Sequence, residues 1–260
     1  MKNVAKAFII WTAISSTPAL SADLISAVAP EAPPVAEQGW TFSVTPYFWA
    51  AGLSGEISQF NLPVVDIDTD FDSIFDHLDF AAMMIGEARY GPYLLFGDLI
   101  YTKLSGDKST PLGIVADDVN LETSTFAGLA GAGYSILEGP SGRLDLVGGV
   151  RIWSVETEIS FNGGLLDGRD FSDSATWVDA LAGVRGNYAF TPKFYAVGWG
   201  LVGAGGADLD WDLMGGVGYN INDTFSATLG YRALGVDYSH DGFLFDVVQQ
   251  GPIAGLTIKF

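Results

Sequence analysis

The sequence contains no cysteine, so neither a disulfide framework nor a thiolate metal site can form. Basic residues are scarce: 12 Lys and Arg stand against 31 Asp and Glu, for a formal net charge of -19. A chain this acidic lacks the basic surface that nucleic-acid binding needs, so we expect no nucleic acid among its partners. Only two histidines are present, His77 and His240, which leaves few candidates for a His-based catalytic site.

Long apolar runs are also missing. Hydrophobic residues make up 48% of the chain and the mean hydropathy is +0.28, which is high for a soluble domain. Beyond Ala22, however, no apolar stretch reaches the length of about 18 residues that a transmembrane helix needs. A chain this hydrophobic must arrange its apolar side chains in another pattern, and alternation along β-strands is the obvious candidate.

The first segment of the chain is typical of a secretory signal peptide and predicts export. Lys2 and Lys6 precede an apolar run over residues 7–14, which is too short to remain as a membrane anchor. We place the signal peptide at residues 1–22, with cleavage after Ala22. Residues 23–38 are rich in proline and alanine, and this composition predicts an extended periplasmic tether.

From Trp40 the sequence alternates between apolar and polar residues, which is the period of a half-buried strand. The alternation recurs in about ten segments, an even number as in bacterial single-chain barrels, with eight or twelve as alternatives. The predicted strands are 40–51, 79–90, 93–104, 119–137, 143–159, 175–189, 193–205, 209–220, 224–237 and 247–260. The faces of 119–137 and 193–205 stay unassigned, because both segments are rich in Gly and Ala.

The connections favour a transmembrane barrel over a soluble β-sandwich, which also has alternating strands. Every second connection is a short turn, whereas 52–78, 105–118, 160–174 and 238–246 are longer, and aromatic residues gather near the short-turn ends. Short periplasmic turns, long external loops and an aromatic girdle are the asymmetry of outer-membrane barrels. The exception is 206–208, a short connection on the external side. We therefore predict an all-β, antiparallel, up-and-down transmembrane β-barrel over residues 39–260.

The end of the chain resembles the C-terminal insertion signal of Gram-negative outer-membrane β-barrel proteins. Gly255, Ile258 and the final Phe260 match that signal, whereas Ile253 stands where a polar residue is usual. The resemblance implies recognition by the barrel-assembly machinery of the cell. The Pro/Ala tether also looks like that of small porin-like surface proteins of the OmpA-like kind. A shared architecture of this sort does not carry a function with it.

Charged residues on the predicted inward faces should meet in the lumen. Opposed charges in a narrow barrel should pair, because an unpaired buried charge is costly. The main interpretation is a salt-bridged plug that holds the barrel shape, and the alternative is a charged constriction that selects small ions. The candidate lumen charges are Arg89, Asp98, Arg151, Asp179, Arg185 and Arg232, with Glu87 and Asp145 beside them.

The first long connection is acidic and gives two further expectations. The run Asp66, Asp68 and Asp70 resembles the start of a calcium loop but lacks the glycine and the bidentate glutamate of an EF-hand. It is read mainly as a solvated face, with a specific cation site as the alternative. Residues 71–78 predict a short helix capped by Asp72 that folds into the external mouth.

These patterns lead to a function in the cell envelope. We expect a structural or surface role, with a narrow channel still open, and outer-membrane lipid and lipopolysaccharide as partners. A low-conductance porin for small ions or solutes is the first alternative. The second is a hydrolase at the barrel rim built on His77 or His240 with neighbouring aspartates. No catalytic residue, cofactor or metal ligand is assigned.

Overall fold

The computed structural model describes residues 39–109, 118–164 and 167–260. The predicted signal peptide and tether lie outside these residues. Within the described part, no helix combines the length and the apolar character that a membrane crossing requires.

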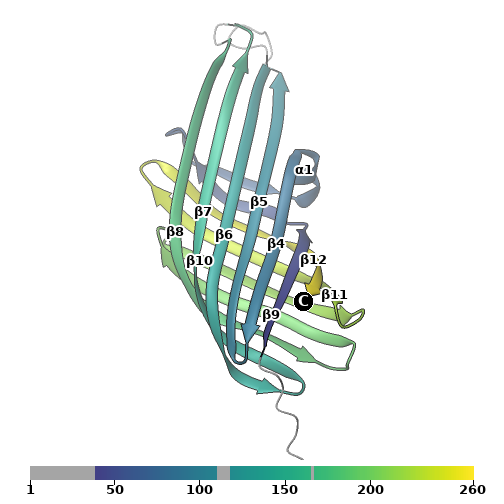
Figure 1. Cartoon of the computed structure of the whole chain (residues 1–260). Helices are drawn as coiled ribbons and strands as arrows, with labels where there is room; N and C mark the ends of the chain where they lie inside the picture. The colour runs from purple at the N-terminus through teal and green to yellow at the C-terminus, as the bar shows by residue number, and fades with distance from the viewer. Residues whose placement is uncertain (1–38, 110–117, 165–166) are drawn as a thin grey trace, which may run out of the picture. The chain divides into compact units, whose positions relative to one another are not determined.

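Ten antiparallel strands close into a barrel, which confirms the predicted fold class and strand count (Figure 1). Each strand pairs with the next along the chain, and β12 pairs back onto β1 to close the ring. The closing strands are β1 (Trp40–Trp49), β4 (Leu78–Tyr90), β5 (Tyr93–Ser109), β6 (Asp118–Gly139), β7 (Gly142–Asn162), β8 (Arg169–Ala189), β9 (Phe194–Gly205), β10 (Leu209–Asn220), β11 (Phe225–His240) and β12 (Phe243–Lys259).

The last strand completes the ring. Ile258 lies opposite Val44 of β1 on one side and opposite Phe225 of β11 on the other. The backbone N–H of Phe260 donates to the carbonyl of Phe42 at 2.9 Å. The segment that resembles an insertion signal is therefore the strand whose pairing removes the two free edges of the sheet.

The connection 52–78 is not the open loop that the sequence predicted. It contains β2 (Gly52–Ser58) and β3 (Val65–Thr69), which form a hairpin. Beyond Ala50, β2 continues the course of β1 and pairs with the first half of β12, so the long β12 has a partner along most of its length. The alternation in these short strands was interrupted by Gly55 and hidden among aspartates, which weakened its signal.

The predicted helix exists, but its bounds, cap and position were wrong. Helix α1 covers Phe71–Asp76, and its N-cap is Asp70, whose carboxylate accepts the backbone N–H of Ser73 at 2.9 Å. Asp72 lies in the first turn instead. The helix does not enter the mouth, because Phe71 packs edge-on against Phe48, an outward residue of β1.

Parts of three other predicted external loops are strand. Strand β5 continues to Ser109, β7 continues to Asn162 and β8 already begins at Arg169, and β11–β12 closes through a two-residue turn. In that turn Asp241 and Gly242 both have positive φ, 47° and 86°, as a tight hairpin requires. The extensions were missed because their outward side chains turn polar, so the apolar alternation that marks a strand fades.

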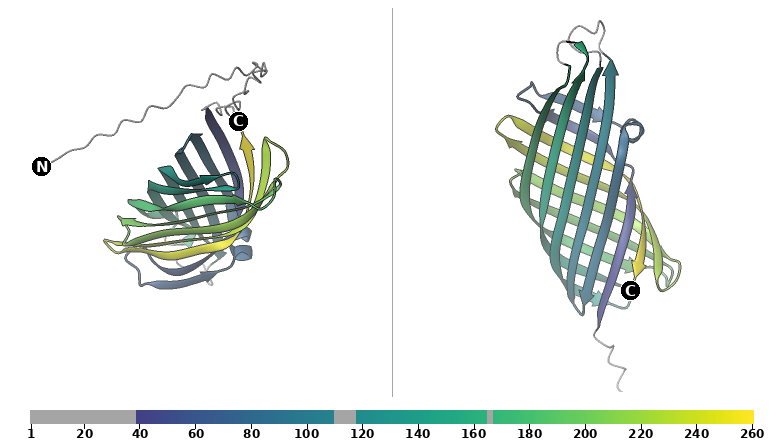
Figure 2. Two further views of the ribbon diagram at one scale, coloured as in Figure 1. Left: turned by 90° about the horizontal axis from the view of Figure 1, so that it is seen from below. Right: turned by 45° about the horizontal axis from the view of Figure 1, so that its top comes forward.

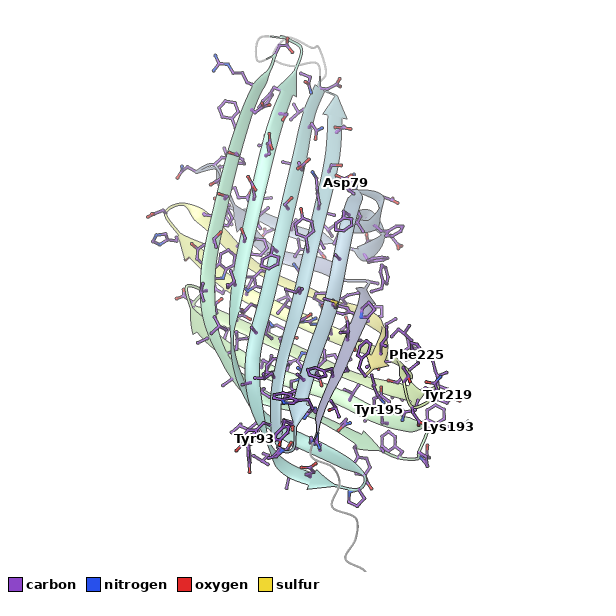
Figure 3. All side chains as sticks on the ribbon, viewed as in Figure 1. Asp79, Tyr93, Lys193, Tyr195, Tyr219 and Phe225 are labelled. Atoms are coloured by element: carbon purple, nitrogen blue, oxygen red, sulfur yellow. The ribbon has the colours of Figure 1, made fainter. Side chains whose placement is uncertain are left out.

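Outward aromatic side chains form two rings. At the short-turn end, Tyr93, Tyr219 and Phe225 lie far from Asp79 (Figure 3). The ring near the other end includes Phe48, Phe80, Tyr101 and Phe126, and Tyr101 lies directly opposite Phe126. Tyr90 and Phe80 are ten residues apart on β4, which is about 33 Å along the strand and roughly 25 Å along the axis at the usual tilt. That spacing matches the apolar band of an outer-membrane barrel.

Strands β5 to β8 rise above the rest of the barrel as a tall wall (Figure 1). In the right-hand view of Figure 2, the strands at the front of the barrel cross over those at its back. Above Tyr101 the outward side chains become polar: Ser105, Glu122, Glu158 and Ser172 lie side by side across the four strands. The hairpin β9–β10, by contrast, turns at residues 206–208. The short connection that looked exceptional in the sequence is thus a real feature of the fold.

Candidate functional site

The candidate site is a network of charges that fills the lumen at mid-height. Arg232 of β11 is fully buried and reaches across the barrel to Asp98 of β5, with an Nη2–Oδ2 distance of 2.6 Å. The same guanidinium donates to Asp212 of β10 at 2.7 and 3.1 Å and to the hydroxyl oxygen of Tyr47 at 2.9 Å. One side chain therefore joins four strands of the barrel, β1, β5, β10 and β11.

A second arginine extends this network. Arg151 of β7 donates from Nη1 to Asp210 at 2.5 Å and from Nη2 to Asp212 at 2.7 Å. Trp153 Nε1 donates to the other oxygen of Asp210 at 2.9 Å, and Trp199 Nε1 donates to Asp212 at 2.8 Å. Asp212 thus accepts hydrogen bonds from two arginines and one tryptophan.

The environment of these ions explains why they can be buried. A charge taken out of water is costly unless partners satisfy it, and here each carboxylate oxygen of Asp98, Asp210 and Asp212 has at least one donor. Arg232 also lies 5.1 Å from the ring centre of Trp49 and 5.3 Å from that of Trp199. These faces add cation–π attraction where no water can compete.

Asp179 departs from the expected pairing. It is inward and fully buried, and it lies opposite Arg151 in the β7–β8 register. The guanidinium of Arg151 nevertheless points toward β10, where the carboxylates of Asp210 and Asp212 accept its hydrogen bonds. Asp179 instead accepts the backbone N–H of Ala207 at 2.8 Å, so it fastens the β9–β10 turn to β8.

A second set of charges lies toward the short-turn end. Arg89 donates to Asp145 at 2.7 Å, and Ser135 donates to the other oxygen of Asp145 at 2.6 Å. Arg185 pairs with Glu87, and its guanidinium lies 4.7 Å from the centre of the Phe96 ring. All six predicted lumen charges therefore point inward, and all except Asp179 pair with an opposite charge.

Above the network, on the tall-wall side, the interior is apolar. Trp177 of β8 stacks on Tyr238 of β11 at 4.0 Å between ring centres, with planes 9° apart. Trp153 lies 5.9 Å from Trp177, and Phe245 of β12 packs against both tryptophans. The tip of the β2–β3 hairpin adds a further contact, because Phe60 N–H donates to Asp173 of β8 at 2.5 Å. The mouth is thus filled by side chains from β7 and β8 on one side of the barrel and from β11 and β12 on the other.

Sequence reasoning missed this aromatic cluster and the central role of Asp212. Neither Asp210 nor Asp212 is among the candidate lumen charges that the sequence predicts. A signal was available, since Asp210 and Asp212 alternate with the apolar Leu209, Trp211 and Leu213 and so had to face inward. The convergence of residues from β5, β7, β10 and β11 depends on barrel closure and has no signal in the sequence.

Below the network lies a cavity of about 270 Å³ toward the short-turn end. Tyr47, Trp199 and Met214 line it next to the charged network, whereas Thr45 and Thr257 line its wall and bond to each other at 2.8 Å. The cavity is a vestibule that ends at the network.

The histidines and the acidic run lie apart from the lumen. His240 Nε2 is 3.2 Å from Asp241 in an exposed turn. His77 directs its Nδ1 to the carbonyl of Ser73 in its own helix, at 2.8 Å. Asp66 lies on the exposed strand β3, where it faces Glu56 of β2 across the hairpin.

Several solved structures resemble this barrel. The outer-membrane protease OmpT of Escherichia coli matches with a TM-score of 0.51 and 12% sequence identity, over 86% of this chain and 98% of that one. Ail, the attachment invasion locus protein of Yersinia pestis, matches at 0.38 with 13% identity, over 86% and 99%. Neisserial surface protein A matches at 0.33 with 13% identity, over 85% and 99%.

These neighbours are Gram-negative outer-membrane β-barrels, and at such low identity the likeness to OmpT shows the fold alone. No protein-family model and no curated protein matches the chain. The shared feature is a closed antiparallel barrel of the outer-membrane type.

Proposed function

We propose that this protein is an outer-membrane β-barrel with a sealed lumen, which serves a structural or surface role in the cell envelope. The apolar band between two aromatic rings supports a place in lipid, and the barrel neighbours support the outer membrane in particular. Short turns on the Trp40 side favour a periplasmic position for that end, so the tall polar wall would stand at the cell surface. Outer-membrane lipid, lipopolysaccharide and the barrel-assembly machinery are the proposed partners.

The observation that carries the sealed lumen is the buried network at mid-height. Arg151 and Arg232 are 2% and 0% exposed, and Asp210 and Asp212 are both fully buried. An aqueous pore would hydrate these groups and expose them. The aromatic cluster around Trp177 lies above the network and gives a second barrier on the side of the tall wall.

Planar bilayer recording tests this proposal. The purified, refolded protein should insert without producing discrete conductance steps, because the salt-bridged cross-section leaves no continuous water path. A general diffusion porin, reconstituted in the same lipid, shows that the assay detects open barrels. Reproducible single-channel steps from this protein would contradict the proposed sealed lumen and favour the low-conductance pore.

We further propose that the barrel has no catalytic role. The Nδ1 atom of His77 bonds to the carbonyl of Ser73 in helix α1. The pair His240–Asp241 lies at the exposed end of the β11–β12 hairpin, where water screens the interaction. A general base needs a positioned partner and a bound substrate within hydrogen-bond reach. If a hydrolase activity of the purified protein were measured and then lost in His77→Ala or His240→Ala, this part of the proposal would fail.

A further inference from the structure

The barrel wall has a lateral seam between β1 and β4. The two strands pair from Trp40 with Tyr90 up to Pro46 with Met84, and there the pairing stops. Beyond that point β1 pairs only with β12 and β4 only with β5. Among the described residues, the β4 edge over 78–83 therefore has no strand partner on its β1 side.

The seam opens inside the apolar band. Phe80, which belongs to the second aromatic ring, lies beyond Met84 on the same edge of β4. Backbone groups left unpaired in contact with hydrocarbon cost several kcal/mol each, which is why membrane barrels close completely. Something other than a strand must shield this edge from lipid.

Helix α1 lies beside this seam, next to the upper part of β4 (Figures 1 and 2). Two of its N–H groups bond within the helix and its cap: Ile74 N–H donates to the carbonyl of Asp70 at 3.1 Å, and Ser73 N–H donates to the carboxylate of Asp70 at 2.9 Å. Because helix hydrogen bonds run along the helix axis, a short helix can lie over the edge without presenting a strand edge of its own.

The apolar face of α1 continues the outward band. Phe71 packs on the outward ring of Phe48 at 5.6 Å, and Phe75 packs on Phe71 at 5.5 Å. Phe75 is 54% exposed, so together with Phe71 it extends the apolar surface that begins at Phe48. The i, i+4 spacing puts both phenylalanines on one face, whereas Asp72 and Asp76 belong to the other.

We infer that α1 is an interfacial plug, which closes the lateral seam between β1 and β4 and docks on the outer leaflet of the membrane through Phe71 and Phe75. The inference rests on the proposed place of the barrel in a membrane. The occupant of the exposed face is lipid at the boundary of acyl chains and headgroups, because this face is continuous with the outward band through Phe48. Asp72 and Asp76 then point toward water, as on other amphipathic surface helices.

The absence of cysteine makes a clean labelling experiment possible. Single cysteines carrying an environment-sensitive fluorophore are placed at three exposed positions of the full-length mature chain, which is refolded into lipid nanodiscs. Phe75→Cys reports on the helix face, Asp76→Cys is the matched control on its polar side, and Leu213→Cys reports on the barrel wall. Quenching is measured with nitroxide lipids labelled near the headgroup end of the acyl chain, and with aqueous iodide.

The label at Phe75→Cys should be quenched by the nitroxide lipid at least about 2-fold more strongly than the label at Asp76→Cys, as expected for an interfacial helix. Iodide should show the reverse order. Phe71→Cys gives a second position on the same face if labelling at residue 75 disturbs the helix. Barrel folding is checked for each variant by the heat-dependent mobility shift of the folded form.

The other possible outcomes contradict either the docking of α1 on lipid or the proposed place of the barrel in the membrane. If Leu213→Cys is quenched by lipid but Phe75→Cys behaves like Asp76→Cys, the barrel is in the membrane and the docking of α1 is wrong. If Phe75→Cys is shielded from both quenchers, a protein surface such as a second copy covers the helix, and lipid docking is also wrong. If Leu213→Cys itself escapes lipid quenching, the proposed place of the barrel fails first.

Discussion

The hairpin β9–β10 and the tall wall β5–β8 belong to the same barrel but differ in strand length and in the residues that they contribute to the lumen. The hairpin strands have 12 residues each and end near the edge of the apolar band, whereas β6, β7 and β8 have 22, 21 and 21 residues. The outward face of the hairpin carries Val202, Leu209, Leu213 and Val217, and its inward face contributes Asp210, Asp212 and Trp199 to the lumen. The wall contributes Asp98, Arg151, Trp153 and Trp177.

The difference shows that strand length and lumen chemistry are separate features of this barrel. The short hairpin is held from the inside, because Asp212 accepts hydrogen bonds from both arginines. The upper wall gains its stability from continuous strand pairing outside the apolar band, where its polar outward face meets water. Substitutions in the two regions should therefore differ in effect by an order of magnitude.

The largest effect is expected in the hairpin. Asp212→Asn removes the charge that both Arg151 and Arg232 contact and leaves two buried guanidiniums undercompensated. Breaking a buried pair of this kind costs roughly 3–5 kcal/mol. Urea unfolding of the barrel in liposomes, followed by tryptophan fluorescence, measures the free energy of unfolding.

Asp223→Asn is the matched control, because Asp223 is exposed in the short turn between β10 and β11. Its unfolding free energy should stay within about 0.5 kcal/mol of the parent protein, as for ordinary surface substitutions. Equal losses in the two variants would mean that the lumen network does not hold the hairpin.

A smaller effect of opposite sign is expected on the wall. Glu158 of β7 lies directly opposite Glu122 of β6, and like charges in this position repel. Glu158→Lys should therefore raise the unfolding free energy by ~0.5 kcal/mol, and Glu158→Gln by less. The gain should shrink at high salt, because exposed charges are screened. A loss of stability on Glu158→Lys would show that the wall uses its acidic face in another way.

The smallest effect concerns pH and helix α1, which lies outside both regions. The hydrogen bonds from Ser73 hold the pKa of Asp70 below its usual value. The stabilisation of α1 by this cap is therefore fully present at a pH above the usual pKa of aspartate, and it is lost as the pH falls through the lowered pKa. Acidification should therefore loosen α1.

The fluorescence of a label at Asp76→Cys, followed while the pH is lowered in the acid range, reports this step. Asp70→Ser provides the control, since serine caps a helix without titrating. The acid transition should be absent in that background. If it persists there, another group controls the helix.

Much of the architecture could be predicted from the sequence. Alternation predicted inward faces for Arg89, Asp98, Arg151, Asp179, Arg185 and Arg232, and the structure places their side chains inside the barrel. The prediction failed in β2 and β3 and in the polar extensions of β5 to β8, where the alternation is weak. It also assigned the N-cap of α1 to the wrong aspartate. The signal peptide, the tether and the role of the C-terminal residues as an insertion signal stay predictions.

The sequence by itself determined the barrel, because a period of two is a local property that each strand displays without its neighbours. Only the tertiary structure decided which charges meet. Arg151 lies opposite Asp179 in the register but bonds to Asp210 and Asp212 across the lumen, since closure brings β10 within reach and leaves Asp179 to the backbone of Ala207. The contacts that seal the lumen join residues distant along the chain, and such contacts exist only once the ring has closed.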